Sequence, residues 1–384
     1  MSEIQLLPSR VGHLPESLTQ KMHAPCFPMT AFEPHPLLRN PHVATVIAAL
    51  WPRKLCRLQA ATERLFDVEP GTRLLAKCHW QRNPQRHPTL VLVHGLEGSS
   101  ESHYMLGIAG KSFASGFNVL RKNQRNCGGT EHLTPTLYDA RLSRDYRAIL
   151  EELIERDGLS EIFFVGYSMG GNLVLKMAGE LGAQAPRELR SICAVCPGLD
   201  PAASSEAIAR SHNFLYERYF LRSYRRRLRL KASLFPERYK AHDITRCRSL
   251  REWDEAITAP ASGYDDANHY YCRASALPVV SRIRVPTLII TAQDDPIVPF
   301  GSFCDPRILN NPFITLIATQ YGGHCGFISR YAGDERFWAE LRVVEFCKKQ
   351  LETDGDSPMK TQEIVRGRSR WQEGISIGRT VEAW

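Results

Sequence analysis

The sequence of 384 residues contains no apolar run long enough to cross a bilayer. The longest candidate, ATVIAALW at residues 44–51, is far shorter than the roughly 20 residues that a membrane-spanning helix needs. The N-terminus MSEIQLLPSR has an acidic residue and lacks the basic, apolar and small-residue order of an export signal. We therefore expect no signal peptide, no N-terminal membrane anchor and a cytoplasmic location.

Motifs for metal and nucleotide binding are also missing. We find no HExxH sequence, no Walker A sequence and no GxGxxG sequence. The 11 cysteines are an odd number spread along the chain, and Cys193-x-x-Cys196 has no second pair to complete a zinc site. We expect free thiols, core packing for this pair, and neither a metal ion nor a cofactor.

Charge of one sign does not dominate the composition. The 49 Lys and Arg residues exceed the 41 Asp and Glu residues by 8, and 43% of the residues are hydrophobic. These values are ordinary for a globular protein and exclude a mostly disordered, collagen-like or coiled-coil chain. The positive excess is modest for this length and no nucleic-acid-binding motif accompanies it, so we predict no nucleic-acid partner.

Short apolar strands alternate with helical segments along most of the chain. The predicted strands are 61–68, 72–79, 89–93, 117–121, 161–166, 191–195, 286–292 and 313–319, with predicted helices at about 138–156, 172–181 and 334–350. This alternation is typical of the α/β class, in which helices cover both faces of a mostly parallel sheet.

The alternation stops between residues 198 and 282, where polar, aromatic and basic segments contain no obvious buried strand. We interpret this stretch as a cap inserted into the α/β core. The predicted divisions are an irregular N-terminal segment 1–60, the first part of the core 61–197, the cap 198–282, the second part of the core 283–351 and a C-terminal tail 352–384.

The sharpest motif is Gly166-Tyr167-Ser168-Met169-Gly170, between a predicted strand and an apolar helix. It fits G-x-S-x-G, in which a serine occupies a sharp strand-to-helix turn and small residues prevent clashes. The helix N-terminus favours negative charge beside the serine oxygen. The motif predicts Ser168 as a nucleophile, the N–H of Met169 as an oxyanion donor, and a supporting role for Gly166 and Gly170.

A second loop, His94-Gly95-Leu96-Glu97-Gly98, follows the strand 89–93 directly. In a sheet of this kind the loop faces the nucleophile, so the N–H of Leu96 would join that of Met169 in an oxyanion hole. We expect Gly95 and His94 to support the loop, and His94 not to act as a base.

A nucleophilic serine needs a base and an acid that orients the base, in the chain order serine, acid, histidine. Asp294 and Asp295 both follow the strand 286–292. Asp295 is favoured because Pro296 fixes the turn that begins there, and Asp294 stays open as an alternative. His324, flanked by glycines after the strand 313–319, is the predicted base.

At these residues the chain resembles the α/β-hydrolase superfamily, and more narrowly its YheT-like branch. The narrower resemblance rests on the sequence PLLRNPH at 36–42, HGLEGSS at 94–100 with Tyr104, a second loop with Asn123, Arg125, Cys127 and Gly129, the tyrosines Tyr264, Tyr270 and Tyr271, and the segments around Asp295 and His324. It covers about residues 30–350. Asn126 stands where the branch usually has glycine, and the chain resembles the soluble bacterial members, not the membrane-anchored eukaryotic ones.

The resemblance implies an α/β-hydrolase fold with an inserted cap, and serine hydrolysis of short- to medium-chain carboxylic esters or acylglycerols through an acyl-enzyme. It also favours Asp295 over Asp294. The expected partner is a small-molecule or lipid ester. A thioesterase or acyltransferase with the same triad stays open, as does a binding or peripheral membrane protein on this fold. The sequence does not specify an oligomeric state.

A basic run crosses the predicted cap beside apolar residues at helical spacing. Its members are Arg222, Arg225, Arg226, Arg227, Arg229 and Lys231. A solvated helix face is the favoured interpretation. The alternative is peripheral contact with an anionic membrane or acidic substrate through this run.

Overall fold

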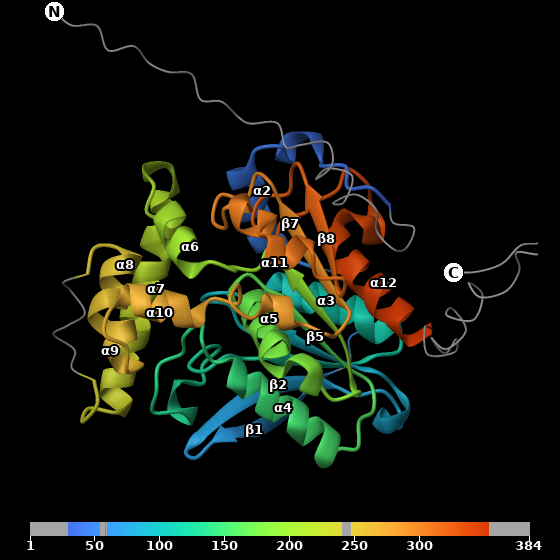
Figure 1. The fold of residues 1–384 in the computed structure, drawn as a ribbon, viewed down its shortest axis with the longest axis horizontal. Helices are drawn as coiled ribbons and strands as arrows, with labels where there is room; N and C mark the ends of the chain where they lie inside the picture. The colour runs from blue at the N-terminus through green and yellow to red at the C-terminus, as the bar shows by residue number, and fades with distance from the viewer. Residues whose placement is uncertain (1–29, 54–57, 59, 240–246, 353–384) are drawn as a thin grey trace, which may run out of the picture.

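The computed structural model describes residues 30–53, 58, 60–239 and 247–352 (Figure 1). The predicted tail 352–384, apart from Glu352, and the first 29 residues of the predicted N-terminal segment lie outside the described residues. Within the described ranges, every helix is too short or too polar to cross a membrane.

Eight strands form one sheet in the order β1-β2-β4-β3-β5-β6-β7-β8. Strand β2 runs antiparallel to both β1 and β4, and the neighbours from β4 to β8 are parallel. The strands are β1 Thr62–Glu69, β2 Thr72–His79, β3 Thr89–Val93, β4 Asn118–Lys122, β5 Ile162–Tyr167, β6 Leu189–Val195, β7 Thr287–Ala292 and β8 Ile314–Thr319. All eight predicted strands are therefore confirmed, each to within about two residues.

The helices differ more from prediction than the strands do. They are α2 Pro41–Leu50, α3 His103–Ala114, α4 Ser143–Glu155, α5 Met169–Leu181, α6 Pro201–Ile208, α7 Phe214–Leu234, α8 Leu250–Trp253, α9 Ala259–Ala261, α10 Ala267–Ala274, α11 Pro306–Leu309 and α12 Trp338–Glu352. Helices α4, α5 and α12 correspond to the three predicted ones. Helix α3 was not predicted.

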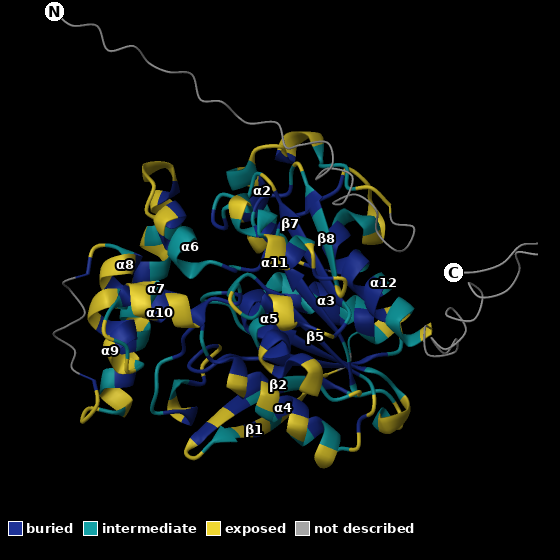
Figure 2. Cartoon of the chain, viewed as in Figure 1, coloured by how far each residue is buried: buried dark blue, intermediate teal, exposed yellow. Residues whose placement is uncertain are grey.

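Alternate residues of the central strands face two separate apolar layers. In β5, Ile162 and Phe164 pack in the layer that includes α4 and α5. Phe163 and Val165 pack in the layer that includes α3 and α12. Burial on both faces explains why these strands are continuous apolar runs in the sequence. In Figure 2 the central strands are dark blue, whereas the outer faces of the helices show exposed residues.

Between β6 and β7 the chain leaves the sheet and forms α6 to α10. The described part of residues 198–282 contains no strand. Figure 1 shows α7, α8, α9 and α10 gathered on one side of the molecule. Leu221, Leu228 and Trp253 join this group to the apolar layer of α4 and α5. The division into core and cap stays a prediction, and "cap" below denotes residues 198–282.

The expectation of an irregular segment is wrong for residues 41–50, which form α2. The Asn40 side chain accepts hydrogen bonds from the N–H groups of His42 (3.0 Å) and Val43 (3.2 Å). Pro41 occupies the first helical position, where its missing N–H costs nothing. Asn40-Pro41 is thus a helix start signal. The helix matters for the site because the Oγ1 of Thr45 accepts a hydrogen bond from the N–H of His324 at 2.9 Å.

Candidate active site

Ser168 stands at the turn between β5 and α5, with φ 53° and ψ −121°. A side-chain-bearing residue rarely adopts a positive φ. The flanking glycines make this turn sterically possible. A Cβ on Gly166 would lie 2.2 Å from the carbonyl oxygen of Gly170, and a Cβ on Gly170 would lie 2.4 Å from the carbonyl oxygens of Val93 and His94. Both distances are far shorter than any van der Waals contact, so only glycine fits.

Ser168, His324 and Asp295 form a continuous chain of contacts. His324 Nε2 lies 2.8 Å from Ser168 Oγ, and His324 Nδ1 lies 2.8 Å from Asp295 Oδ2. The His324 side chain is 12% exposed and the Asp295 side chain is fully buried. The structure therefore brings together three side chains from the ends of three strands, separated by up to 156 positions in the sequence.

The two adjacent aspartates have different contacts. Asp295 Oδ1 accepts hydrogen bonds from the N–H groups of Ile297 (2.8 Å) and Val298 (2.9 Å), which leaves Oδ2 for the histidine. Asp294 Oδ1 instead accepts the N–H of Gly323 at 2.9 Å. Asp294 thus braces the backbone of the loop that carries His324, while Asp295 contacts the imidazole itself.

The charge of Asp295 changes the electrostatics of the histidine. Burial by itself would lower the pKa of His324, but the Asp295 charge and its hydrogen bond raise that pKa well above the usual range. The same carboxylate fixes the orientation of the ring, because Nδ1 must carry a proton to donate to it. Nε2 is then the nitrogen that can accept a proton from Ser168.

The 94–98 loop lies against the serine. A Cβ on Gly95 would lie 2.9 Å from Ser168 Cβ, so this close approach also requires glycine. Leu96 and Met169 line the same cavity as Ser168 and His324. Met169 is the first residue of α5, and its N–H has no partner within the first helical turn.

His94 is fully buried and supports the backbone. Its Nδ1 lies 2.7 Å from the Gly95 carbonyl oxygen, and its Nε2 accepts the N–H of Gln124 at 3.0 Å. Burial lowers the pKa of His94 to about 4, so the ring is neutral in this arrangement. These contacts join the 94–98 loop to a second loop, residues 123–129.

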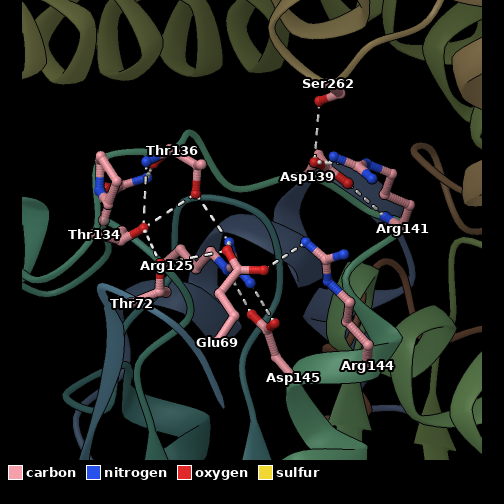
Figure 3. Close-up of polar contacts among 12 residues, drawn as sticks. Glu69, Thr72, Arg125, Thr134, Thr136, Asp139, Arg141, Arg144, Asp145 and Ser262 are labelled. Carbon is pink, nitrogen blue, oxygen red and sulfur yellow. Dashed lines mark hydrogen bonds and ion pairs between the residues drawn. The ribbon is translucent and has the colours of Figure 1, made fainter. Parts of the chain in front are cut away.

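The 123–129 loop is anchored by Arg125, as Figure 3 shows. Arg125 forms a two-point contact with Asp145 of α4, with Nε 2.7 Å from Oδ2, and it also pairs with Glu69 at the end of β1. Its Nη1 donates to Thr136 Oγ1 at 2.9 Å. In the same loop, Asn126 has φ 62°, a left-handed conformation that asparagine tolerates. These buried contacts fix the loop that in turn holds His94.

The basic run in α7 does not lie on one solvated face. Arg222, Arg226 and Arg229 are exposed, whereas Arg227 pairs with Glu97, and Lys231 donates to the carbonyl oxygen of Glu131 at 3.0 Å. The solvated-face interpretation is therefore wrong for Arg227 and Lys231. Their spacing after Tyr224, by three and seven positions, puts them on the inward side of the helix and could have revealed this.

A cavity of about 630 Å³ opens beside Ser168, His324 and Cys325. Its walls are mostly apolar and come from α2, the cap and the loop after Asp295. They include Val46, Ala49, Leu50, Ile208, Leu215, Tyr219, Phe220, Tyr224, Ile297 and Val298. The volume is ordinary for a small-molecule site.

One group of metal-ligating side chains occurs within the described ranges. The ligand atoms of Cys196, His324 and Cys325 lie within 4.8 Å of one another. Both ring nitrogens of His324 already contact Ser168 and Asp295, so a cation bound there would compete with those contacts. Cys193 and Cys196 are both fully buried, as expected for core packing.

Comparison with known proteins places the chain in a family. The alpha/beta hydrolase fold family matches residues 88–331, which contain all three side chains of the contact chain. The chain belongs to the α/β-hydrolase family. It is 31% identical over 318 residues to YheT of Escherichia coli (strain K12), named as a candidate esterase, with 82% of this chain and 92% of that protein covered.

Two further similarities extend this assignment. The α/β-hydrolase chain is 29% identical over 242 residues to the mouse protein named phospholipase ABHD3, which covers 63% of this chain and 58% of that protein. The crystal structure of the 2,6-dihydroxy-pseudo-oxynicotine hydrolase matches with a TM-score of 0.53 and 16% identity, over 77% of this chain and 69% of that one. At that identity the likeness concerns the fold alone.

Proposed function

We propose that this α/β-hydrolase cleaves carboxylic esters through an acyl-enzyme on Ser168. It is a carboxylic ester hydrolase of the esterase and lipase type, as its relatives' names indicate. The observation that supports the finer proposal is the unbroken contact chain from Asp295 through His324 to Ser168 at the wall of an apolar cavity.

In the proposed first step, Ser168 Oγ attacks the ester carbonyl carbon and its proton passes to His324 Nε2. Asp295 stabilises the imidazolium, in line with the raised pKa of His324. The N–H groups of Leu96 and Met169 hold the oxygen that becomes negative. His324 then gives the proton to the leaving alcohol.

In the second step, water replaces the alcohol. His324 takes a proton from the water as it attacks the acyl carbonyl, and returns that proton to Ser168 as the acid leaves. The chemistry needs no group beyond these side chains and the two backbone N–H groups.

The apolar wall supports an acyl chain as the part of the substrate that fills the cavity. Each methylene buried from water stabilises binding by about 0.8 kcal/mol, or about 4-fold in kcat/KM. We expect kcat/KM to rise by about 4-fold for each added methylene, from acetyl toward medium-length acyl chains. The rise should stop when the cavity of about 630 Å³ is full.

The test is hydrolysis of p-nitrophenyl esters from acetyl to palmitoyl, with the corresponding thioesters in parallel. Ser168→Ala is the inactive variant, and Ser204→Ala is a matched control because Ser204 lines the same cavity outside the contact chain. Labelling by a fluorophosphonate reports the reactivity of the serine without any assumption about the substrate.

Turnover and labelling that disappear in Ser168→Ala and persist in Ser204→Ala would support the proposal. Activity retained by Ser168→Ala would overturn the assignment of the nucleophile. Faster turnover of thioesters than of esters in every chain length would instead favour a thioesterase.

A further inference from the structure

Arg227 of α7 joins the cap to both loops beside the serine. Its Nη2 lies 2.8 Å from Glu97 Oε2, and its Nη1 contacts Glu97 Oε1. Its Nε donates to the carbonyl oxygen of Asn126 at 3.0 Å. One side chain therefore connects the cap to the 94–98 loop and to the 123–129 loop.

The pair is removed from water. The side chains of Arg227 and Glu97 are 11% and 4% exposed. The guanidinium carbon of Arg227 lies 4.5 Å from the centre of the Tyr138 ring. Because the Arg227–Glu97 ion pair has two contacts and is largely shielded from solvent, its geometry is well defined. If either side chain rotated away, both would lose hydrogen bonds that water could not replace.

Tyr138 completes the fixation of Glu97. The tyrosine hydroxyl accepts the N–H of Glu97 at 3.2 Å and donates to Glu97 Oε1 at 2.7 Å. Burial and the charge of Glu97 raise the pKa of Tyr138 well above its usual range, so the hydroxyl keeps the proton that it donates. Both the backbone and the carboxylate of Glu97 are thus held.

Glu97 itself has φ 58°, a conformation that a residue with a side chain rarely adopts. Such backbone strain persists only where surrounding contacts impose it. Leu96, the residue directly before Glu97, carries one of the two N–H groups proposed to bind the oxyanion. The contacts that hold Glu97 therefore constrain the backbone that directly follows Leu96.

We propose that Arg227 is a positioning residue, which acts through Glu97 to hold the N–H of Leu96 in the geometry that stabilises the oxyanion. The inference rests on the proposed ester hydrolysis. Its consequence is that the cap takes part in the chemistry of every substrate, besides forming the wall of the cavity.

The test compares Arg227→Met, Arg227→Lys and Arg226→Met with the unchanged protein. Methionine keeps part of the apolar stem of Arg227 and removes its donors, while lysine keeps the charge and loses the two-point contact. Arg226 is exposed on the same helix, so Arg226→Met is the matched control. The double variant Arg227→Met/Glu97→Gln avoids leaving an unpaired buried carboxylate if Arg227→Met folds poorly.

Loss of one oxyanion donor lowers kcat by about 10²–10³-fold, and a displaced donor retains part of its effect. We expect kcat to fall about 10–100-fold in Arg227→Met and in the double variant, with KM changed less than about 3-fold. Arg227→Lys should recover part of the loss. Arg226→Met should stay within about 2-fold of the unchanged protein, because it touches neither loop.

An alkyl trifluoromethyl ketone separates positioning from general loss of structure. Ser168 Oγ bonds to its carbonyl carbon, the carbonyl electron pair moves to the oxygen, and the serine proton passes to His324, so the adduct carries the oxyanion. Its inhibition constant should rise by the same factor as kcat/KM falls. The inhibition constant of an alkyl alcohol of equal length, which forms no oxyanion, should not change.

The inference is overturned if kcat of Arg227→Met stays within about 2-fold of the unchanged protein, or if kcat falls while the ketone binds equally well. An equal loss in Arg226→Met would also overturn it. If the unchanged protein neither turns over esters nor reacts with the fluorophosphonate, the proposed function fails and this inference fails with it. If the unchanged protein does both, a negative result counts against Arg227 alone.

Discussion

The sheet side and the cap side of the cavity are built in different ways. On the sheet side, Ser168, Asp295 and His324 each lie within five residues of a strand end, and backbone contacts fix their positions. On the cap side, mostly apolar side chains of several helices, above all α7, form the wall, and some are largely exposed, such as Leu215 at 65% and Tyr219 at 58%. Arg227 is the residue of the cap that binds the 94–98 and 123–129 loops through an ion pair and a backbone hydrogen bond.

This contrast indicates which changes alter the reaction and which alter the choice of substrate. Side chains on the sheet side are held by hydrogen bonds to the backbone and to one another, so a change there should slow every ester equally. The wall on the cap side contributes burial of apolar surface, which differs between long and short acyl chains. The four predictions below test this division, from the largest expected effect to the smallest.

The two aspartates give the strongest test of the sheet side. Asp295→Asn should lower kcat by about 10³–10⁴-fold for short and long esters alike, because an amide no longer holds the imidazole in the required tautomer. Asp294→Asn should lower kcat less than about 10-fold, since Asp294 contacts the backbone of Gly323 and not the ring. Steady-state kinetics with two chain lengths measures both, and the opposite order of losses would contradict the assignment.

A substitution in the turn at Ser168 should lower the stability of the protein as well as its rate of catalysis. Gly170→Ala puts a Cβ 2.4 Å from two carbonyl oxygens, and we expect the free energy of unfolding to fall by about 3 kcal/mol. Gly110→Ala in α3 is the control, because a Cβ there meets nothing within 4 Å and alanine should raise the stability by about 0.5–1 kcal/mol. Urea unfolding measures both, and equal effects would refute the steric argument.

Lowering the pH should reduce the free energy of unfolding through the protonation of His94, which lies on the sheet side. Its pKa is about 4 in the folded protein against 6.5 in the unfolded chain, so the folded state binds fewer protons between these values. Stability is therefore lost as the pH falls below about 6.5, and His94 alone should cost ~2 kcal/mol between pH 7.5 and pH 5. In His94→Asn the difference in unfolding free energy between these pH values should shrink by that amount, measured by urea unfolding. An unchanged difference would contradict the role of His94.

The cap wall should give the smallest effect and a selective one. Phe220→Ala enlarges the cavity and should lower kcat/KM for a medium-chain ester by about 5–10-fold, with less than about 2-fold change for the acetyl ester. Leu230→Ala, on the same helix and exposed, is the control. A uniform loss at all chain lengths in Phe220→Ala would show that the division between the two sides does not hold for this residue.

The sheet and the segments that carry the proposed catalytic side chains were predictable because their signals are local. Mostly apolar runs of five or six residues specify strands buried on both faces. Glycines close to Ser168 and close to His324 in the sequence indicate a sharp turn at each of these two residues. The position of Asp295 after β7 follows from the strand end and from Pro296. The roles of these residues remain proposals, which the kinetic tests above address.

Other features were missed because their signals are weak or shared with other structures. Helix α3 has only a partial start signal, since Ser102 occupies the N-cap but neither a proline nor an acidic residue follows in the first turn. Helix α2 has a start signal in Asn40-Pro41, but its residues are mostly apolar and lack a clear polar face. A run of arginines is usually solvated, so the inward direction of Arg227 is visible only from the spacing of its apolar neighbours.

The sequence by itself determined where the strands lie along the chain, the strained serine turn and the three strand ends near which the side chains of the contact chain lie. Each of these depends on a few consecutive residues, whose sterics and burial pattern allow one local conformation. Only the tertiary structure decided that Thr45 supports His324, that Asp294 braces its loop, and that Arg227 binds Glu97. Those contacts join residues 29 to 279 positions apart, and no local pattern specifies which distant segments pack together.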